Sequence, residues 1–125
     1  MAQSPLKKHR KSAFNRQNGK CCYCGFQMWQ NSAEEFATQH KISVKQAMHF
    51  QCTAEHLRAR QDGGKDSSLN IAAACKRCNR LRHSRKTAPS PSDYQRFVQK
   101  RLNTGGWIAI PPTANLPRSR APVIE

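Results

Sequence analysis

The sequence predicts a small α+β fold in which two short strands are followed by a helix, with further helices on either side of this unit. Three observations predict it. Short runs at 51–57 and 70–74 have the length and composition of strands rather than of helices. Serines precede several stretches with apolar residues at helical spacing. Two Cys-x-x-Cys pairs lie before the first run and after the second, and the length of 125 residues suits one domain.

Residues 1–18 are predicted to form a basic arm or short helix. They contain five Lys or Arg residues and no acidic residue. Ser4 followed by Pro5 is typical of a helix start, because serine caps the free amides and proline fits the first helical position. Gly19 then marks the end of the arm and the beginning of the main domain, which is predicted to span 19–104.

Two short helices are expected within 32–50. Ser32 stands three residues before Glu35, which is the spacing of a capping box. Ser43 is a second start signal, because apolar residues follow it at helical spacing. The chain is therefore expected to turn between the two helices, near 41–42.

A core of two strands and one helix is predicted at 51–87. The polar loop between the strands contains the adjacent glycines Gly63 and Gly64. Residues 75–86 follow the second strand and hold six Lys or Arg residues with Leu81 as the single large apolar side chain. This helix is therefore expected to be mostly exposed.

The last predicted helix, 92–103, is amphipathic and begins at Ser92 after a Pro-Ser-Pro break. The apolar residues on one face of it are Tyr94, Phe97, Val98 and Leu102. Gly105 and Gly106 end the helix. The remaining segment, 105–125, contains four prolines and is expected to be an unstructured tail.

The charge balance narrows the class of partner. Lys and Arg number 22 against seven Asp and Glu, which gives a formal net charge of +15 and an isoelectric point near 10.3. Such an excess disfavours a basic partner and favours a polyanion, most commonly nucleic acid. No apolar run approaches the ~20 residues of a membrane span, and the N-terminus lacks the apolar stretch of a secretion signal. We therefore expect a protein of the reducing cytosol, where cysteines serve as metal ligands rather than disulfides.

The spacing of the cysteines predicts a structural zinc site. Its four ligands are expected to be Cys21, Cys24, Cys75 and Cys78. Each Cys-x-x-Cys pair places two thiolates at adjacent corners of a tetrahedron, and four thiolates leave no coordination position for water. Redox dithiols and unpaired core cysteines are the alternatives. Cys22 lies inside the first pair, where the spacing favours the outer two cysteines as ligands, and Cys52 is expected to be a small buried apolar residue.

A second pattern lies between the cysteine pairs. An acid-His pair, a Gly-Gly loop, an Asn at the second strand and an Asn after the last Cys pair occur in this order: Glu55-His56, Gly63-Gly64, Asn70 and Asn79. The stretch Thr53–Lys86 thereby resembles the ββα-metal motif, or His-Me finger, of the HNH endonuclease family in its zinc-stapled form. It departs from the most literal pattern at Asn79, where many members have His, and is an H-N-N variant.

The resemblance implies roles for four residues. His56 would be the general base, a task that suits imidazole because it exchanges protons near neutral pH. Glu55 and Asn79 would hold a catalytic Mg²⁺ or Mn²⁺ through hard oxygen ligands. Asn70 would fix the loop that keeps the base in place. His83, four residues after Asn79 on the same helical face, is a third metal ligand, a phosphate contact or a plain surface histidine.

The implied activity is hydrolysis of DNA phosphodiester bonds, with double-stranded DNA as the partner. Residues expected to contact nucleic acid are Arg58, Arg60, Lys76, Arg77, Arg80, Arg82, Arg85 and Lys86. A zinc-ribbon protein that binds nucleic acid without catalysis is the alternative, and a nuclease for RNA or structured DNA is a further one. The resemblance favours a bacterial or phage-encoded cytoplasmic protein. Whether it forms a homodimer, and so cuts one strand or two, stays open.

Overall fold

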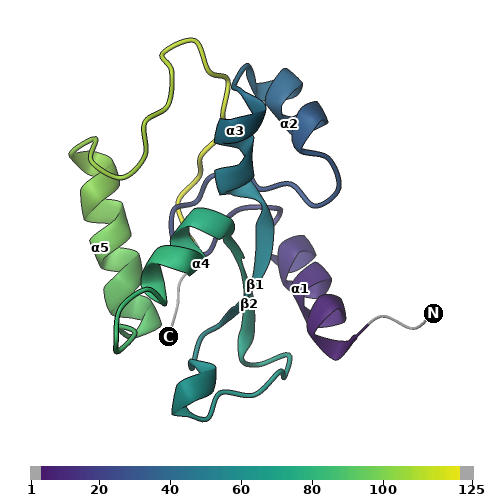
Figure 1. Cartoon of the computed structure of the whole chain (residues 1–125), viewed down its shortest axis with the longest axis vertical. Coiled ribbons are helices and arrows are strands. Elements are labelled where there is room, and N and C mark those ends of the chain that lie inside the picture. Colours follow the sequence, from purple (N-terminus) through teal and green to yellow (C-terminus); the bar gives the residue numbers. More distant parts are fainter. Residues whose placement is uncertain (1–3, 122–125) are drawn as a thin grey trace.

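The computed structural model describes residues 4–121, and it has the predicted α+β class, with a two-stranded hairpin followed by a helix (Figure 1). The elements in chain order are α1 (Pro5–Arg16), α2 (Ala33–His40), α3 (Val44–Ala47), the 3₁₀ turn η1 (Met48–Phe50), β1 (Cys52–His56), the 3₁₀ turn η2 (Arg60–Asp62), β2 (Ile71–Cys75), α4 (Lys76–Arg82) and α5 (Pro91–Asn103). Three residues of the expected basic arm, 1–3, and the last four of the expected tail, 122–125, lie outside the described part. No helix between residues 4 and 121 is long and apolar enough to cross a bilayer.

The hairpin forms the centre of the molecule. β1 and β2 are antiparallel, with Cys52 opposite Cys75 and His56 opposite Ile71. Every residue of β2 is buried, because α1 and α4 pack on the hairpin from different sides (Figure 1). Gln17 at the end of α1 adds two hydrogen bonds to the backbone of Ala73. These two bonds attach the end of α1 to the middle of β2.

Side-chain caps fix where the helices begin. Ser4, Ser32 and Ser43 each accept a hydrogen bond from an amide three residues on, as their spacing predicts. The last helix begins earlier than expected, because Ser90 is its cap and Pro91 occupies the first turn. The helix after β2 ends at Arg82, so residues 83–86 of the expected helix lie beyond it.

The segment after Gly106 differs from the unstructured tail that its prolines predict. Over 107–121 it has no helix or strand, but it lies against the domain and makes hydrogen bonds to it (Figure 1). Trp107 is buried against Tyr94, and the amide of Ser119 donates to the carbonyl of Gly25. Gly25 has to be glycine, since a Cβ there would lie 2.1 Å from the Ser119 carbonyl oxygen. Proline excludes regular structure from this segment without preventing it from packing.

Candidate functional site

The four cysteines of the two Cys-x-x-Cys pairs meet in one buried cluster. The sulfur atoms of Cys21, Cys24, Cys75 and Cys78 all lie within 4.8 Å of one another. The Cys24 and Cys75 sulfurs are 3.8 Å apart, and the ligand sulfurs of a tetrahedral zinc with bonds of about 2.3 Å have nearly that separation, about 3.8 Å. Cys22 and Cys52 lie outside the cluster, as expected, and both are buried. The group is consistent with a structural zinc site.

The electrostatics of the cluster also favour a divalent cation. Burial raises the pKa of the Cys24 and Cys78 thiols well above the ordinary value, whereas hydrogen bonds from the other cysteines outweigh burial at Cys21 and lower its pKa. One thiolate is therefore favoured, and four together need a compensating charge. The backbone already offers part of that compensation. The amides of Tyr23 and Cys75 point at the Cys21 sulfur, at 3.4 and 3.3 Å.

Glu55 lies at the centre of a second cluster, beside the first. Its side chain on β1 is fully buried, and each carboxylate oxygen has its own partners. Oε2 accepts hydrogen bonds from the Tyr23 hydroxyl at 2.7 Å and from Arg82 Nη1 at 3.2 Å. Oε1 lies 2.7 Å from His83 Nε2. The two oxygens are therefore distinguished by the fold: one is held from the interior, and the other faces the histidine after α4.

Asn79 lies on α4 next to the same cluster. Its side-chain nitrogen donates to Thr53 Oγ1 and to the Ala54 carbonyl, both at 3.0 Å. These bonds tie α4 to β1 and fix the amide, so that its oxygen is the atom left to bind a ligand. The helical spacing of Asn79 and His83 places them one turn apart, on the side of α4 that contacts β1.

His56 follows Glu55 at the end of β1 and contacts the loop. Its Nε2 lies 2.6 Å from Asp66 Oδ1, and Arg60 bonds the same carboxylate at 3.2 Å. In the bond to Asp66 it is Nε2 that donates, because a carboxylate can only accept, and Arg60 Nε lies 3.2 Å from the same ring nitrogen. The hydrogen bond from His56, together with the charge of Arg60, holds the pKa of Asp66 below its usual range.

Asn70 links the two ends of this loop. Its side chain accepts from the amide of Arg58 at 2.8 Å and donates to the carbonyls of Arg58 and Lys65. The chain also turns tightly at Gly64, where a Cβ would lie 1.7 Å from the Arg58 carbonyl oxygen. The loop that carries Asp66 is therefore defined by its own hydrogen bonds.

Comparison with known families agrees with this arrangement. The family model described as HNH endonuclease matches residues 47–85, which include β1, β2 and α4. Residues 47–85 form an HNH endonuclease domain. No curated protein and no solved structure matched the chain.

The cations expected around the HNH domain fall into two groups. The first group is exposed and forms no ion pair within residues 4–121. Its members are Arg58, Lys76, Arg80, Arg85 and Lys86. Arg60 is also exposed but pairs with Asp66. Arg77 is half-buried, bonds the Trp107 carbonyl and lies over its ring. The guanidinium of Arg77 is therefore not free to contact a phosphate.

Arg82 is buried and differs most from the sequence-based expectation of a phosphate contact. Besides Glu55, its guanidinium donates to the carbonyls of His56 and Leu57 at 2.9 Å and to that of Pro89. All its donors point inward. The structure thus assigns Arg82 to the support of the HNH domain rather than to its surface.

Two residues of this site were not recognised in the sequence: Tyr23 and Asp66. Tyr23 stands inside the first Cys-x-x-Cys pair, and Asp66 is one of two acids in the loop. Their positions between recognised motif residues were the one available signal.

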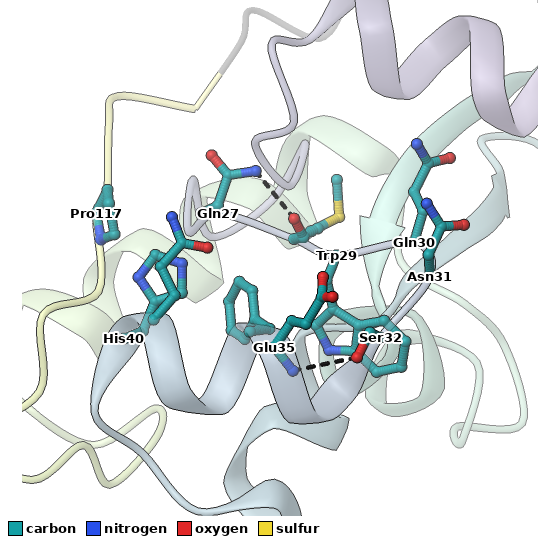
Figure 2. Close-up of a pocket in the computed structure, with 11 residues that line it drawn as sticks. Gln27, Trp29, Gln30, Asn31, Ser32, Glu35, His40 and Pro117 are labelled. Atoms are coloured by element: carbon teal, nitrogen blue, oxygen red, sulfur yellow. Dashed lines mark hydrogen bonds between the residues drawn. The ribbon is translucent and has the colours of Figure 1, made fainter.

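One cavity lies away from the HNH site. Figure 2 shows it between α2, the segment 27–32 and Pro117, with Glu35 and His40 in its lining. It contains no Lys or Arg, and His40 is engaged with the Asn115 carbonyl. The cavity is therefore poorly suited to phosphate.

Proposed function

We propose that the chain is a metal-dependent DNA endonuclease that hydrolyses phosphodiester bonds at the Glu55 cluster. The observation that carries the proposal is the convergence of Glu55, His83 and Asn79 beside His56 within the HNH domain. A zinc-ribbon binding protein would account for the cysteines and the charge, but it would have no use for this second cluster.

The residues fit a hard divalent cation such as Mg²⁺ or Mn²⁺. Adjacent ligands of an octahedral ion with bonds of about 2.1 Å lie about 3 Å apart. Glu55 Oε1 and His83 Nε2 are separated by 2.7 Å, so a small movement would let both bind one ion. Asn79 Oδ1 would be the third ligand. When bound, the ion would stabilise negative charge on the phosphate and on the departing oxygen.

His56 is the proposed general base. With the hydrogen on Nε2 held by Asp66, the lone pair on Nδ1 takes the proton from the attacking water. The side chain is 12% exposed, so it is sheltered but reachable. Asn70 and Gly64 keep the loop, and with it Asp66, in position.

DNA is the proposed polyanion, and the exposed cations form its contact surface. Burial lowers the pKa of His49, and the nearby charges of Arg77, Arg80, Lys45 and Lys76 lower it further, in keeping with a positive surface at the start of α4. A hollow between α1 and β1 continues this surface and is lined by Lys7, Arg10 and Lys76. Arg10 Nε is buried there without a hydrogen-bond partner among residues 4–121. We include Lys7 and Arg10 in the proposed phosphate contacts.

Cleavage by a His56→Ala variant tests the proposal. Removing a general base lowers the rate by about 10²–10⁴-fold, while binding to the phosphates needs no base. We therefore expect His56→Ala to bind duplex DNA with unchanged affinity and to cleave it at least 100-fold more slowly. A wild-type protein that binds DNA but leaves it intact with Mg²⁺ and Mn²⁺ would favour the zinc-ribbon alternative.

A further inference from the structure

We infer that Tyr23, held between the cysteines of the first zinc-binding pair, positions Glu55 for the catalytic metal and so makes the affinity for that metal depend on the zinc site. This inference rests on the proposed function, because it takes Glu55 as a ligand of the catalytic ion. Tyr23 is a positioning residue, since it reaches the metal through Glu55 and not directly.

The contact between the two sites is direct and buried. Tyr23 is completely buried, and its hydroxyl donates to Glu55 Oε2 at 2.7 Å. Burial raises the pKa of Tyr23, so the phenol stays protonated and remains a donor. Cys24, a member of the sulfur cluster, is the next residue, and Cys21 accepts a hydrogen bond from the Tyr23 amide.

The arrangement selects one carboxylate oxygen for the metal. Tyr23 and Arg82 occupy Oε2 from the interior, and Oε1 alone faces His83. A buried carboxylate that is held by two donors cannot rotate without breaking both bonds. The ligand atom is therefore placed before the metal arrives, which is how hydrogen-bonded partners of ligands raise metal affinity.

The zinc site in turn holds Tyr23. Its ring packs edge-on against Tyr94, with 4.8 Å between the centroids, and the Tyr94 hydroxyl donates to the carbonyl of the ligand Cys78. Hydrogen bonds such as those from Gln99 to the Tyr23 carbonyl and from Cys22 to the Ala73 carbonyl hold this backbone, and a cation shared by the cysteines on either side of Tyr23 would hold it more firmly. Loss of zinc would loosen the turn that carries the phenol, and so weaken its hold on Glu55, even if the hairpin persisted.

Mn²⁺ binding to the full-length, zinc-loaded protein without DNA tests the inference. The free Mn²⁺ signal in electron paramagnetic resonance gives the dissociation constant for the wild type, Tyr23→Phe and Trp29→Phe. Tyr23→Phe removes only the hydroxyl that reaches Glu55, and we expect it to weaken Mn²⁺ binding about 10–100-fold. Trp29→Phe is the control, because it removes a partly buried ring N–H that donates to the Ala47 carbonyl and touches neither Glu55 nor the four cysteines, and it should stay within about twofold of the wild type.

Zinc content and circular dichroism establish that each variant is loaded and folded. A zinc-loaded, folded Tyr23→Phe with wild-type Mn²⁺ affinity would overturn the inference. The hydroxyl proton of Tyr23 gives a second readout that needs no variant: its resonance should shift when Mg²⁺ is added, and an unmoved resonance would contradict the inference.

Glu55→Gln separates the inference from the function on which it rests. If Glu55→Gln weakens Mn²⁺ binding and Tyr23→Phe does not, only the positioning role of Tyr23 fails. If Glu55→Gln leaves the affinity unchanged, the ligand assignment in the proposed function fails with it.

Discussion

Arg82→Met should destabilise the protein far more than any other removal of a charge from α4. Arg82 is 2% exposed and forms an ion pair with Glu55, which is itself fully buried. Methionine fills much of the same volume but leaves the carboxylate with one interior donor fewer. It also leaves the carbonyls of Leu57 and Pro89 without the guanidinium.

The size of the effect follows from these contacts. Breaking a buried ion pair from one side costs about 3–5 kcal/mol of unfolding free energy, against a total of about 5–15 kcal/mol for a domain. With a urea dependence of about 1.5–2 kcal/mol per molar, the unfolding midpoint should fall by about 2–3 M. Arg80→Met, on the exposed side of the same helix, should change the free energy by less than about 0.5 kcal/mol.

Urea unfolding followed by circular dichroism, at constant excess zinc and with a reductant, measures both variants. The two variants should also separate in DNA affinity, since Arg80 is exposed and Arg82 is not. If Arg82→Met unfolds within about 0.3 M urea of Arg80→Met, the buried role of Arg82 is refuted.

Three further predictions concern the base, the surface and the zinc. Asp66→Asn should lower kcat about tenfold or more with little change in KM, because the carboxylate orients His56. Steady-state cleavage assays measure both constants, and an unchanged kcat would contradict this role. The double variant Lys7→Ala/Arg10→Ala should reduce the slope of log DNA affinity against log salt concentration by about 1.8. The control double variant Lys8→Ala/Arg16→Ala, elsewhere on α1, should leave this slope unchanged. Equal slopes for the two double variants would show that α1 is not part of the DNA-binding surface. Acid should release zinc and lower the stability, because protons compete for thiols whose pKa is raised by burial; the stabilisation is thus present at neutral pH and lost as the pH falls. Zinc release followed with a chromogenic chelator should be shifted to higher pH in Cys24→Ser but not in Cys22→Ser, and equal release curves would argue against the four-cysteine site.

Much of the fold was accessible from local signals. The cysteine spacing predicted which four thiols meet, because two Cys-x-x-Cys pairs have few ways to satisfy one tetrahedral ion. The serine caps predicted the starts of α1, α2 and α3, since a cap is a contact over three residues and needs no tertiary information. The strand positions were correct to within one residue at the ends that meet the loop.

The depth of individual side chains was less accessible. The many basic residues around Arg82 predict that it is an exposed cation. It lies four residues after the buried Cys78, however, and therefore on the same face of α4. That spacing was the available signal. The contacts of Tyr23 and Asp66 join residues that are 32 and 10 positions apart, and no local pattern encodes them.

The segment after α5 was misjudged for a related reason. Its prolines exclude helix and strand and so predict an unstructured tail, but they do not prevent the segment from packing. Trp107 indicated that it packs, because burial of a large aromatic side chain stabilises the fold by more free energy than ordering an irregular backbone costs. Backbone hydrogen bonds from Gln27 to Pro117 and from Asn115 to His40 then hold the rest of the segment.

Cleavage of supercoiled plasmid by the purified protein tests the central claim most directly. The wild type should convert the plasmid to the nicked circle, or to the linear form if two chains act together, with Mg²⁺ or Mn²⁺, and EDTA should stop the reaction. Glu55→Gln, loaded with zinc and bound to DNA, should be inactive at the same metal concentration. Cleavage that persists in EDTA or in Glu55→Gln would contradict a metal-dependent site at Glu55.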